Sequence, residues 1–317
     1  MRRKRWWIRI SVLIFLLLIA AGACFERPWY RPGPPQLGLT KNWTADLSAA
    51  EELIPSRHGQ AKDITWALSR GQQTPWAFAY LHGFSASRKE ISPTLEQISE
   101  LMRANVFWSR LTQHGLDGEG FKSLSADDFF RDSEEAYQVL KEIGRNRVLV
   151  GTSTGGTLAL AQALWHPDLT AIILISPNFG ASKKEAWLAG GPLGPLMARL
   201  ILGDYYEWKP KNERHGEYWT TKYRVEGLTA LLDMVNAVKR MPVENLRVPC
   251  LVFLNESDSV IDPQKAAKFI SRAPKNVCKI KWIKAEDHVL AGDTLSPSST
   301  AEVVTEILAF LRTLPQP

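Results

Sequence analysis

Short runs of purely apolar residues recur along the chain and set its expected framework. They lie at residues 76–80, 148–150, 171–175 and 251–254. A run of this kind, without polar positions, is typical of a strand that is buried on both faces. Another strand-like run covers 278–283, and the segment 157–165 is compatible with a helix. The polar residues that directly follow these strands are the first places to look for chemistry.

The strand at 148–150 leads into Gly151-Thr152-Ser153-Thr154-Gly155-Gly156 and then into the helix-compatible segment. A strand, a sharp glycine-rich turn and a helix form a nucleophile elbow, in which a serine hydroxyl stands exposed above the sheet. A hydroxyl is a weak nucleophile until a base takes its proton. Ser153 is therefore the predicted nucleophile, and a base and an acid are expected after it in the chain.

Asp258 is the predicted acid, because it lies just beyond the strand at 251–254. A carboxylate at that position can accept the Nδ1 proton of a histidine and stabilise the imidazolium that forms during attack. Asp262 is the alternative. It precedes Pro263, however, and this pair is typical of the cap and first residue of a helix.

His288 is the predicted base. It is the one histidine that follows the acid, and it lies in the loop after the strand at 278–283. The chain order serine, acid, histidine is the order that distinguishes this elbow-based architecture from other serine hydrolases. The sequence thus predicts a catalytic triad of Ser153, Asp258 and His288.

The oxyanion that forms during attack needs hydrogen-bond donors that are already in place. The apolar run at 76–80 leads into Leu81-His82-Gly83-Phe84-Ser85. The backbone N–H groups of Phe84 and of Thr154, the residue after the nucleophile, are the predicted donors. Gly83 permits a tight turn, and His82 is interpreted as a residue that shapes this loop.

Together these motifs resemble the α/β-hydrolase superfamily, and within it the monoacylglycerol-lipase-like and carboxylesterase-like branch that is also grouped with serine aminopeptidases. The resemblance covers roughly residues 60–312 and rests on the His82-Gly83-Phe84 loop, the elbow, the Asp258 loop and His288. It implies an α/β-hydrolase fold, with a mostly parallel eight-stranded sheet flanked by helices and a cap inserted after the sixth strand. One departure is Leu111-Thr112-Gln113-His114-Gly115, where relatives often carry a glycine before the His-Gly pair.

The strands at 171–175 and 251–254, taken as the sixth and seventh, are separated by about 75 residues. A single crossover helix needs far fewer, so we expect the cap at about 178–245. It contains Trp187, Trp208, Trp219 and a helix-like apolar run. Leu196, Leu200 and Ile201 fall on one face of this run, which either packs on the cap's own core or contacts an acyl chain. An apolar roof suits an acyl ester better than a charged peptide.

The first 25 residues form a separate segment, predicted to be a membrane anchor or signal peptide. A basic head with Arg2, Arg3, Lys4, Arg5 and Arg9 precedes an apolar stretch at 10–25. This stretch is shorter than the ~20 residues of a comfortable span. It is expected to stay as an anchor, to be cleaved after Ala23, or to be lipidated at Cys24. In each case the positive-inside rule places the catalytic domain on the non-cytoplasmic side of the membrane, which is the periplasm or another extracytoplasmic space. The alternatives to a membrane anchor are a secreted protein and a lipoprotein.

A proline-rich tether is expected at 26–40, followed by the hydrolase domain at 41–317. The formal net charge of +6 reflects the basic head, since the rest of the chain is nearly neutral. This charge therefore indicates topology and not nucleic-acid binding. The chain lacks H-E-x-x-H and Walker A motifs, and no metal or cofactor is expected. Cys250 and Cys278 begin neighbouring strands, where they form either a disulfide or two buried thiols.

The predicted function is hydrolysis of carboxylic esters, with lipase or monoacylglycerol substrates, through an acyl-enzyme on Ser153. The partner is then a small-molecule acyl ester, together with the membrane through the N-terminal segment. Two alternatives remain open at this point. The same triad would serve a serine peptidase or aminopeptidase acting on short peptides, or the chain is a membrane-tethered binding protein without turnover. Acyl transfer to an alcohol uses the same groups.

Overall fold

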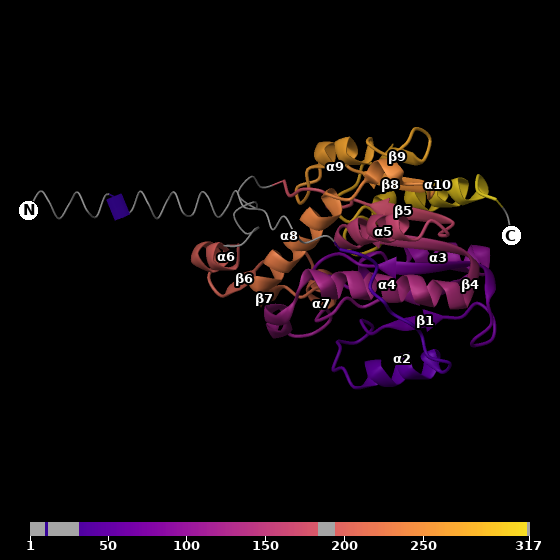
Figure 1. Ribbon diagram of the computed structural model, residues 1–317, viewed down its shortest axis with the longest axis horizontal. Coiled ribbons are helices and arrows are strands. Elements are labelled where there is room, and N and C mark those ends of the chain that lie inside the picture. The colour runs from indigo at the N-terminus through magenta and orange to yellow at the C-terminus, as the bar shows by residue number, and fades with distance from the viewer. Residues whose placement is uncertain (1–9, 12–31, 183–193, 316–317) are drawn as a thin grey trace, which may run out of the picture.

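A single main sheet lies at the centre of the computed structural model, which describes residues 10–11, 32–182 and 194–315 (Figure 1). The sheet has seven strands in the order β1-β3-β2-β4-β5-β8-β9. Their bounds are Asp63–Thr65 for β1, Thr74–Leu81 for β2, Asn105–Trp108 for β3, Gly144–Thr152 for β4, Ala171–Ile175 for β5, Cys250–Leu254 for β8 and Cys278–Trp282 for β9. Only β1 runs antiparallel to its neighbour, and the other adjacent strands are parallel.

The predicted mostly parallel sheet is confirmed, but its strand count differs from the eight expected. The described segment ahead of β1 forms the helix α2 (Trp43–Glu52) and no strand, so β1 pairs directly with β3 at the edge of the sheet. The strands taken as sixth, seventh and eighth are consequently β5, β8 and β9. Local apolar patterns identified these three strands correctly. The total of eight strands came from the family resemblance, and the described residues ahead of β1 supply no further strand.

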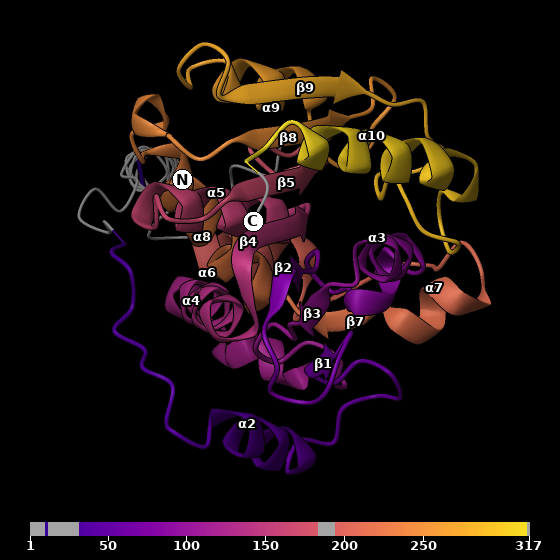
Figure 2. The same cartoon turned by 90° about the vertical axis from the view of Figure 1, so that its right-hand side faces the viewer.

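Helices cover both faces of the sheet (Figure 2). The helices α4, α5 and α8 lie over one face, and α3 and α10 lie over the other. Their bounds are Thr94–Met102 for α3, Ala126–Ile143 for α4, Thr154–Trp165 for α5, Glu226–Lys239 for α8 and Thr300–Arg312 for α10; α9 (Pro263–Ile270) follows β8. Successive side chains of a strand point to opposite faces, so each internal strand supplies both layers. In β2, Ala79 and Leu81 join the first layer, while Phe78 and Tyr80 join the second.

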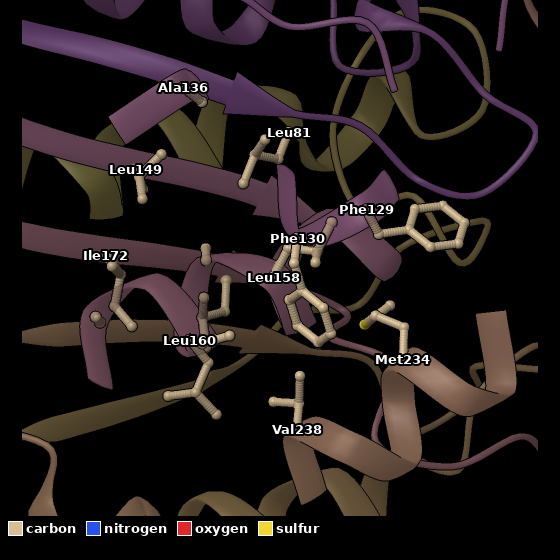
Figure 3. Packing of buried hydrophobic residues seen from close by; sticks show 14 of the residues in the cluster. Leu81, Phe129, Phe130, Ala136, Leu149, Leu158, Leu160, Ile172, Met234 and Val238 are labelled. Carbon is tan, nitrogen blue, oxygen red and sulfur yellow. The ribbon is translucent and has the colours of Figure 1, made fainter. Parts of the chain in front are cut away.

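The chain between β5 and β8 contains α6 (Gly194–Leu202), β6 (Tyr205–Glu207), α7 (Glu213–Tyr218), β7 (Lys222–Arg224) and α8. β6 and β7 form a separate antiparallel ribbon. The helix α8 is part of the main hydrophobic core, because Met234 and Val238 are fully buried there. Figure 3 shows these two side chains beside Phe130 of α4 and Leu160 of α5. The cap predicted at about 178–245 stays a prediction, and it would include a helix that belongs to the core.

The predicted anchor or signal segment at 1–25 lies outside the described residues, apart from positions 10 and 11. So do Trp187 of the predicted cap and residues 26–31 of the predicted tether. Within the described parts of the chain, no helix has both the length and the apolar character required to cross a membrane.

Candidate active site

Ser153 occupies the sharp turn between β4 and α5. Its backbone has φ 53° and ψ −111°, a conformation that residues with a side chain rarely adopt. The turn is held from outside, because the Ser153 N–H donates to the carbonyl of Ile175 (2.8 Å) and its carbonyl accepts from the Asn178 N–H (3.1 Å). The strain is thus supported by the neighbouring strand end, as the predicted elbow requires.

Glycines around Ser153 allow the close packing of this elbow. A Cβ on Gly155 would lie 1.8 Å from the carbonyl oxygen of Leu81, and one on Gly151 would lie 2.2 Å from the carbonyl oxygen of Gly155. Neither space can hold a side chain. The glycines therefore let α5 begin directly against β2, with Ser153 at the junction.

His288 and Asp258 are brought together by the neighbouring strands β8 and β9, whose ends they follow. His288 Nδ1 lies 2.6 Å from Asp258 Oδ2, so the Nδ1–H donates to the carboxylate. The other carboxylate oxygen accepts the N–H groups of Val260 (2.8 Å) and Ile261 (3.0 Å). Burial alone would raise the pKa of Asp258, but the hydrogen bond and charge of His288 and these two N–H groups lower it below its usual value.

The remaining nitrogen of His288 is the one that would act as base. His288 Nε2 is buried and has no hydrogen-bond partner among the described residues. It lines the same cavity as Ser153. With Nδ1 protonated toward Asp258, Nε2 carries the lone pair that can accept a serine proton.

Asp262 takes the role of a helix cap. Its carboxylate accepts the Lys265 N–H (3.0 Å) at the start of α9, and Pro263 is the first helical residue. The prediction that it caps a helix is confirmed. Its side chain is used by α9, and His288 pairs with Asp258 instead.

The two predicted oxyanion donors both border the cavity. Thr154 is the first residue of α5, where the N–H groups of a helix have no internal acceptor and favour negative charge. Phe84 lies in the turn after β2, and the adjacent Gly83 N–H is already used, since it donates to Glu90 Oε1 (2.6 Å). No described residue accepts from the Phe84 N–H. Both donors are therefore available to a bound ligand.

The loop at residues 81–85 is called the oxyanion loop, after the role predicted for Phe84. His82 holds the shape of this loop, in line with its sequence interpretation. Its Nε2 accepts the Leu111 N–H (3.0 Å), and its Nδ1 lies 2.8 Å from the Gly83 carbonyl, to which it donates. Burial lowers the pKa of His82 to about 4, with the charge of Arg110 acting in the same direction. The ring is therefore neutral at physiological pH and fixed in one tautomer. His114, in the segment that departs from the family pattern, packs beside His82 and Phe84.

A cavity of about 1550 Å³ extends from Ser153 and His288 to the segment between β5 and β8. Its apolar lining comes mainly from α6, α8 and aromatic residues, and it includes Ala198, Ile201, Leu202, Leu228, Leu231, Val235, Trp208, Trp219 and Tyr223. Lys122, Lys209 and Glu226 are among the charged lining residues. The space is wide enough for a long apolar group to lie beside Ser153.

The apolar face predicted on α6 behaves differently from its sequence interpretation. Leu196 and Leu200 are 52% and 66% exposed and do not line the cavity, so among the described residues they pack on no core. Ile201, although 56% exposed, does line the cavity. Helical periodicity grouped the three residues on one face, but it could not show which of them borders the site.

The segment between β5 and β8 is hydrogen-bonded to three of the loops that carry predicted catalytic groups. The Thr220 N–H donates to the Ser85 carbonyl (2.7 Å) in the oxyanion loop. The Ser182 N–H donates to the Val260 carbonyl (3.1 Å) beside Asp258. Asn212 Nδ2 donates to the Thr294 carbonyl (2.8 Å) in the loop that follows His288. This segment therefore helps to position the triad loops as well as lining the cavity.

The two cysteines that begin β8 and β9 face each other in the sheet. Cys250 and Cys278 are register partners, and both are free thiols here. Burial raises the pKa of the Cys250 thiol well above its usual value, and the neighbouring Cys278 acts in the same direction. Both thiols stand at the starts of their strands, whereas the predicted catalytic residues follow strand ends. Across the described residues, no group of three or more His, Cys, Asp and Glu side chains could hold a metal ion.

The fold, the elbow and the order of the triad residues define an α/β hydrolase. The sequence pattern of the serine aminopeptidase S33 family matches residues 112–294, a range that includes Ser153, Asp258 and His288. The chain therefore belongs to this family.

Known relatives include lipolytic enzymes. The chain is 26% identical over 210 residues to a thermostable monoacylglycerol lipase of Bacillus sp. (strain H-257), covering 65% of this chain and 81% of the relative. A structure from the metagenome-derived lipolytic enzymes LipS and LipT matches with a TM-score of 0.64 at 19% identity, covering 81% of this chain and 99% of that one. A monoacylglycerol lipase of Paleococcus ferrophilus matches with a TM-score of 0.61 at 14% identity, covering 80% and 98%. The chain is thus a lipase-like α/β hydrolase.

Proposed function

We propose that this protein is a serine hydrolase that cleaves carboxylic esters through an acyl-enzyme on Ser153. The observation that carries the proposal is the pair of His288 and Asp258 at 2.6 Å, with the free Nε2 of His288 in the cavity that Ser153 lines. A strained serine, an oriented imidazole and a buried carboxylate are the three parts that acyl transfer requires.

In the proposed first half-reaction, the Ser153 hydroxyl attacks the ester carbonyl while His288 Nε2 takes its proton. The carbonyl oxygen becomes an oxyanion, which the N–H groups of Phe84 and Thr154 stabilise. Asp258 stabilises the imidazolium. His288 then gives the proton to the leaving alcohol, and the acyl group remains on Ser153.

In the second half-reaction, His288 Nε2 takes a proton from water as the water attacks the acyl-enzyme. The same two N–H groups hold the second oxyanion. Collapse of this intermediate releases the carboxylic acid and returns the proton from His288 to Ser153. No group outside the chain, other than water, is needed for this cycle.

An ester with an apolar acyl chain is the proposed substrate class, and a monoacylglycerol fits that description. The support is the apolar and aromatic lining that α6 and α8 give to the cavity. We further propose that the chain at about 178–245 acts as a cap over the site. The N-terminal segment at 1–25 is proposed to tether the enzyme to a membrane, with the catalytic domain on the non-cytoplasmic side.

The test is to measure initial rates of the full-length chain in detergent on p-nitrophenyl esters of increasing acyl length. S153A is expected to lower kcat more than about 10³-fold. S69A, which changes an exposed serine ahead of β2, is expected to leave the rates unchanged. A fluorophosphonate probe should label the wild type and S69A but not S153A.

Other outcomes would separate the alternatives. Turnover of an alanine p-nitroanilide without ester turnover would indicate a peptidase. Absence of both turnover and labelling in the wild type would indicate the binding protein. A rate that peaks at one acyl length supports the ester proposal and measures the reach of the cavity.

A further inference from the structure

Glu90 is a buried acidic residue that the proposed mechanism does not use. It ends the short helical turn η1 (Arg88–Glu90), is only 1% exposed, and borders the catalytic cavity. Its Oε1 accepts two hydrogen bonds, from the Gly83 N–H (2.6 Å) and from the Tyr80 hydroxyl (2.8 Å). A carboxyl group is costly to bury, so its place beneath the oxyanion loop calls for a physical reason.

The carboxyl group of Glu90 lies next to the predicted nucleophile. The position that a Cβ on Gly83 would take is 3.0 Å from Glu90 Oε2 and 3.5 Å from Ser153 Cβ. The side chains of Glu90 and Ser153 therefore flank the same point of the oxyanion loop. A Cβ at position 83 would press on the carboxyl group, which would have to shift by a few tenths of an ångström.

Glu90 also fixes the direction of the peptide groups in this loop. Because the Gly83 N–H donates to Glu90, that donor is not available to an oxyanion. The next N–H along the chain, that of Phe84, has no acceptor among the described residues. Anchoring one peptide group in this way restricts the orientation of the next, which is the predicted oxyanion donor.

The same network reaches the elbow and the loop that follows His288. The Tyr80 hydroxyl lies 2.7 Å from Oγ1 of Thr152, the residue before the nucleophile. A Cβ on Gly292, in the loop that follows His288, would lie 2.5 Å from the carbonyl oxygen of Glu90. Glu90 is thus in contact with the oxyanion loop and linked through Tyr80 to the elbow, and its backbone packs against the His288 loop.

We propose that Glu90 is a positioning residue, which holds the Gly83 peptide as an uncharged carboxylic acid so that the Phe84 N–H is directed at the oxyanion. This proposal rests on the proposed function of Ser153. Arg88, which begins the same helical turn as Glu90, is paired with Asp63. None of the ion pairs between described residues involves Glu90. An ionised carboxyl here would oppose the negative charge that develops beside Ser153.

Burial favours the protonated form of Glu90. Tyr80 faces it from β2, Glu96 of α3 acts electrostatically on the same tyrosine, and His288 shares the cavity. Burial raises the pKa of Glu90 to about 8, against the opposing effect of the Gly83 and Tyr80 hydrogen bonds. Above this pH the carboxyl group ionises, and we expect acylation to slow.

The test compares full-length wild type, E90A, E90Q and E100Q. Glutamine retains an oxygen that can accept from Gly83 and Tyr80 but cannot ionise, whereas alanine removes the acceptor. E100Q makes the same chemical change at an exposed position of α3. For a p-nitrophenyl ester at pH 7, E90A should lower kcat about 10-fold to 100-fold with KM within about twofold, and E90Q should stay within about threefold of wild type.

The pH profile adds a readout that a structural role would not move. Wild-type and E100Q rates are expected to fall above about pH 8, while E90Q keeps its rate there. The proposal is overturned if E90Q follows the wild-type profile, if E90Q is as impaired as E90A, or if E90A matches E100Q. Because E90Q retains both acceptor contacts, it keeps the test valid even where E90A does not fold.

Fluorophosphonate labelling separates this proposal from the proposed function. The phosphoryl oxygen of the probe occupies the oxyanion site while the serine attacks. The labelling rate therefore reports on that site without requiring that the preferred ester substrate be known. Labelling without ester turnover would contradict the ester assignment, and a slower rate in E90A but not in E90Q would still support the role of Glu90. Equal labelling rates in all four proteins would overturn that role.

Discussion

His288 Nδ1 and Asp258 Oδ2 lie 2.6 Å apart although the two residues are separated by 30 positions in the chain. The parallel pairing of β8 with β9 brings their loops to one edge of the sheet. The distance thus depends on the register of two strands, and the imidazole is oriented before any substrate binds.

Replacing the acid should therefore reduce catalysis more than stability. D258N is expected to lower kcat about 10³-fold to 10⁴-fold, because an amide can hold His288 in the wrong tautomer. The matched variant D262N changes the cap of α9. Asparagine caps a helix about as well as aspartate, so the free energy of unfolding should stay within about 0.5 kcal/mol of wild type, with kcat unchanged. Steady-state kinetics and urea unfolding of both variants check this prediction, which an inactive D262N with normal stability would contradict.

The elbow glycine is expected to be essential for folding. In G155A the new Cβ would lie 1.8 Å from the Leu81 carbonyl oxygen, so α5 and β2 must separate. We expect a loss of more than about 3 kcal/mol in unfolding free energy, or failure to fold. G38A, where no atom lies within 4 Å of the added Cβ, is the control. Melting temperatures of G155A and G38A that agree within error would rule out this packing argument.

Acyl-chain preference should respond to Ile201 and not to Leu200. I201D places a charge in the lining of the cavity, so kcat/KM for long-chain esters should fall about tenfold or more relative to short ones. L200D changes an exposed neighbour on the same helix, and the ratio should stay near that of wild type. A series of p-nitrophenyl esters on both variants gives the ratio directly. A shift in L200D alone would place the acyl chain elsewhere.

Burial of a neutral His82 makes stability depend on acid pH. Its pKa falls from 6.5 in the unfolded chain to about 4 in the folded one, so its contribution is complete above pH 6.5 and is lost as the pH falls toward 4. The full effect is on the order of 3 kcal/mol. H82Q should flatten the unfolding free energy between pH 7 and pH 4.5, relative to H58Q at an exposed position. Identical slopes in the two variants would count against a buried neutral imidazole.

The triad candidates could be identified from sequence because each follows a strand: Ser153 and Asp258 follow the buried ends of β4 and β8, and His288 follows the edge strand β9. Continuous apolar runs at β4 and β8 made their ends visible, and the order serine, acid, histidine then restricted the choice to Ser153, Asp258 and His288. Asp262 was separated from Asp258 by Pro263, which marks a helix start. These are local signals, so a single sequence carries them.

Contacts that depend on distant chain segments could not be predicted in this way. Glu90 lies seven residues after Gly83 in a short turn, and only the fold brings its carboxyl group back to the Gly83 N–H. An acidic residue directly before the apolar Ile91 was the one available signal. The exposure of Leu200 could not be predicted from the sequence for a similar reason, because periodicity defines a helix face but not which residues pack against it. The count of eight strands came from the family resemblance, and the described residues ahead of β1 form α2 and no further strand.

The hydrogen bonds of Thr220, Ser182 and Asn212 to three loops that carry predicted catalytic groups have a consequence for how this enzyme can diverge. The segment that lines the pocket and would select a substrate is thus joined by hydrogen bonds to the loops that would carry out the reaction. A substitution that reshapes the pocket wall is therefore expected to shift these loops as well. Changes in substrate range would therefore come with changes in turnover, and compensating substitutions should be sought at these three junctions.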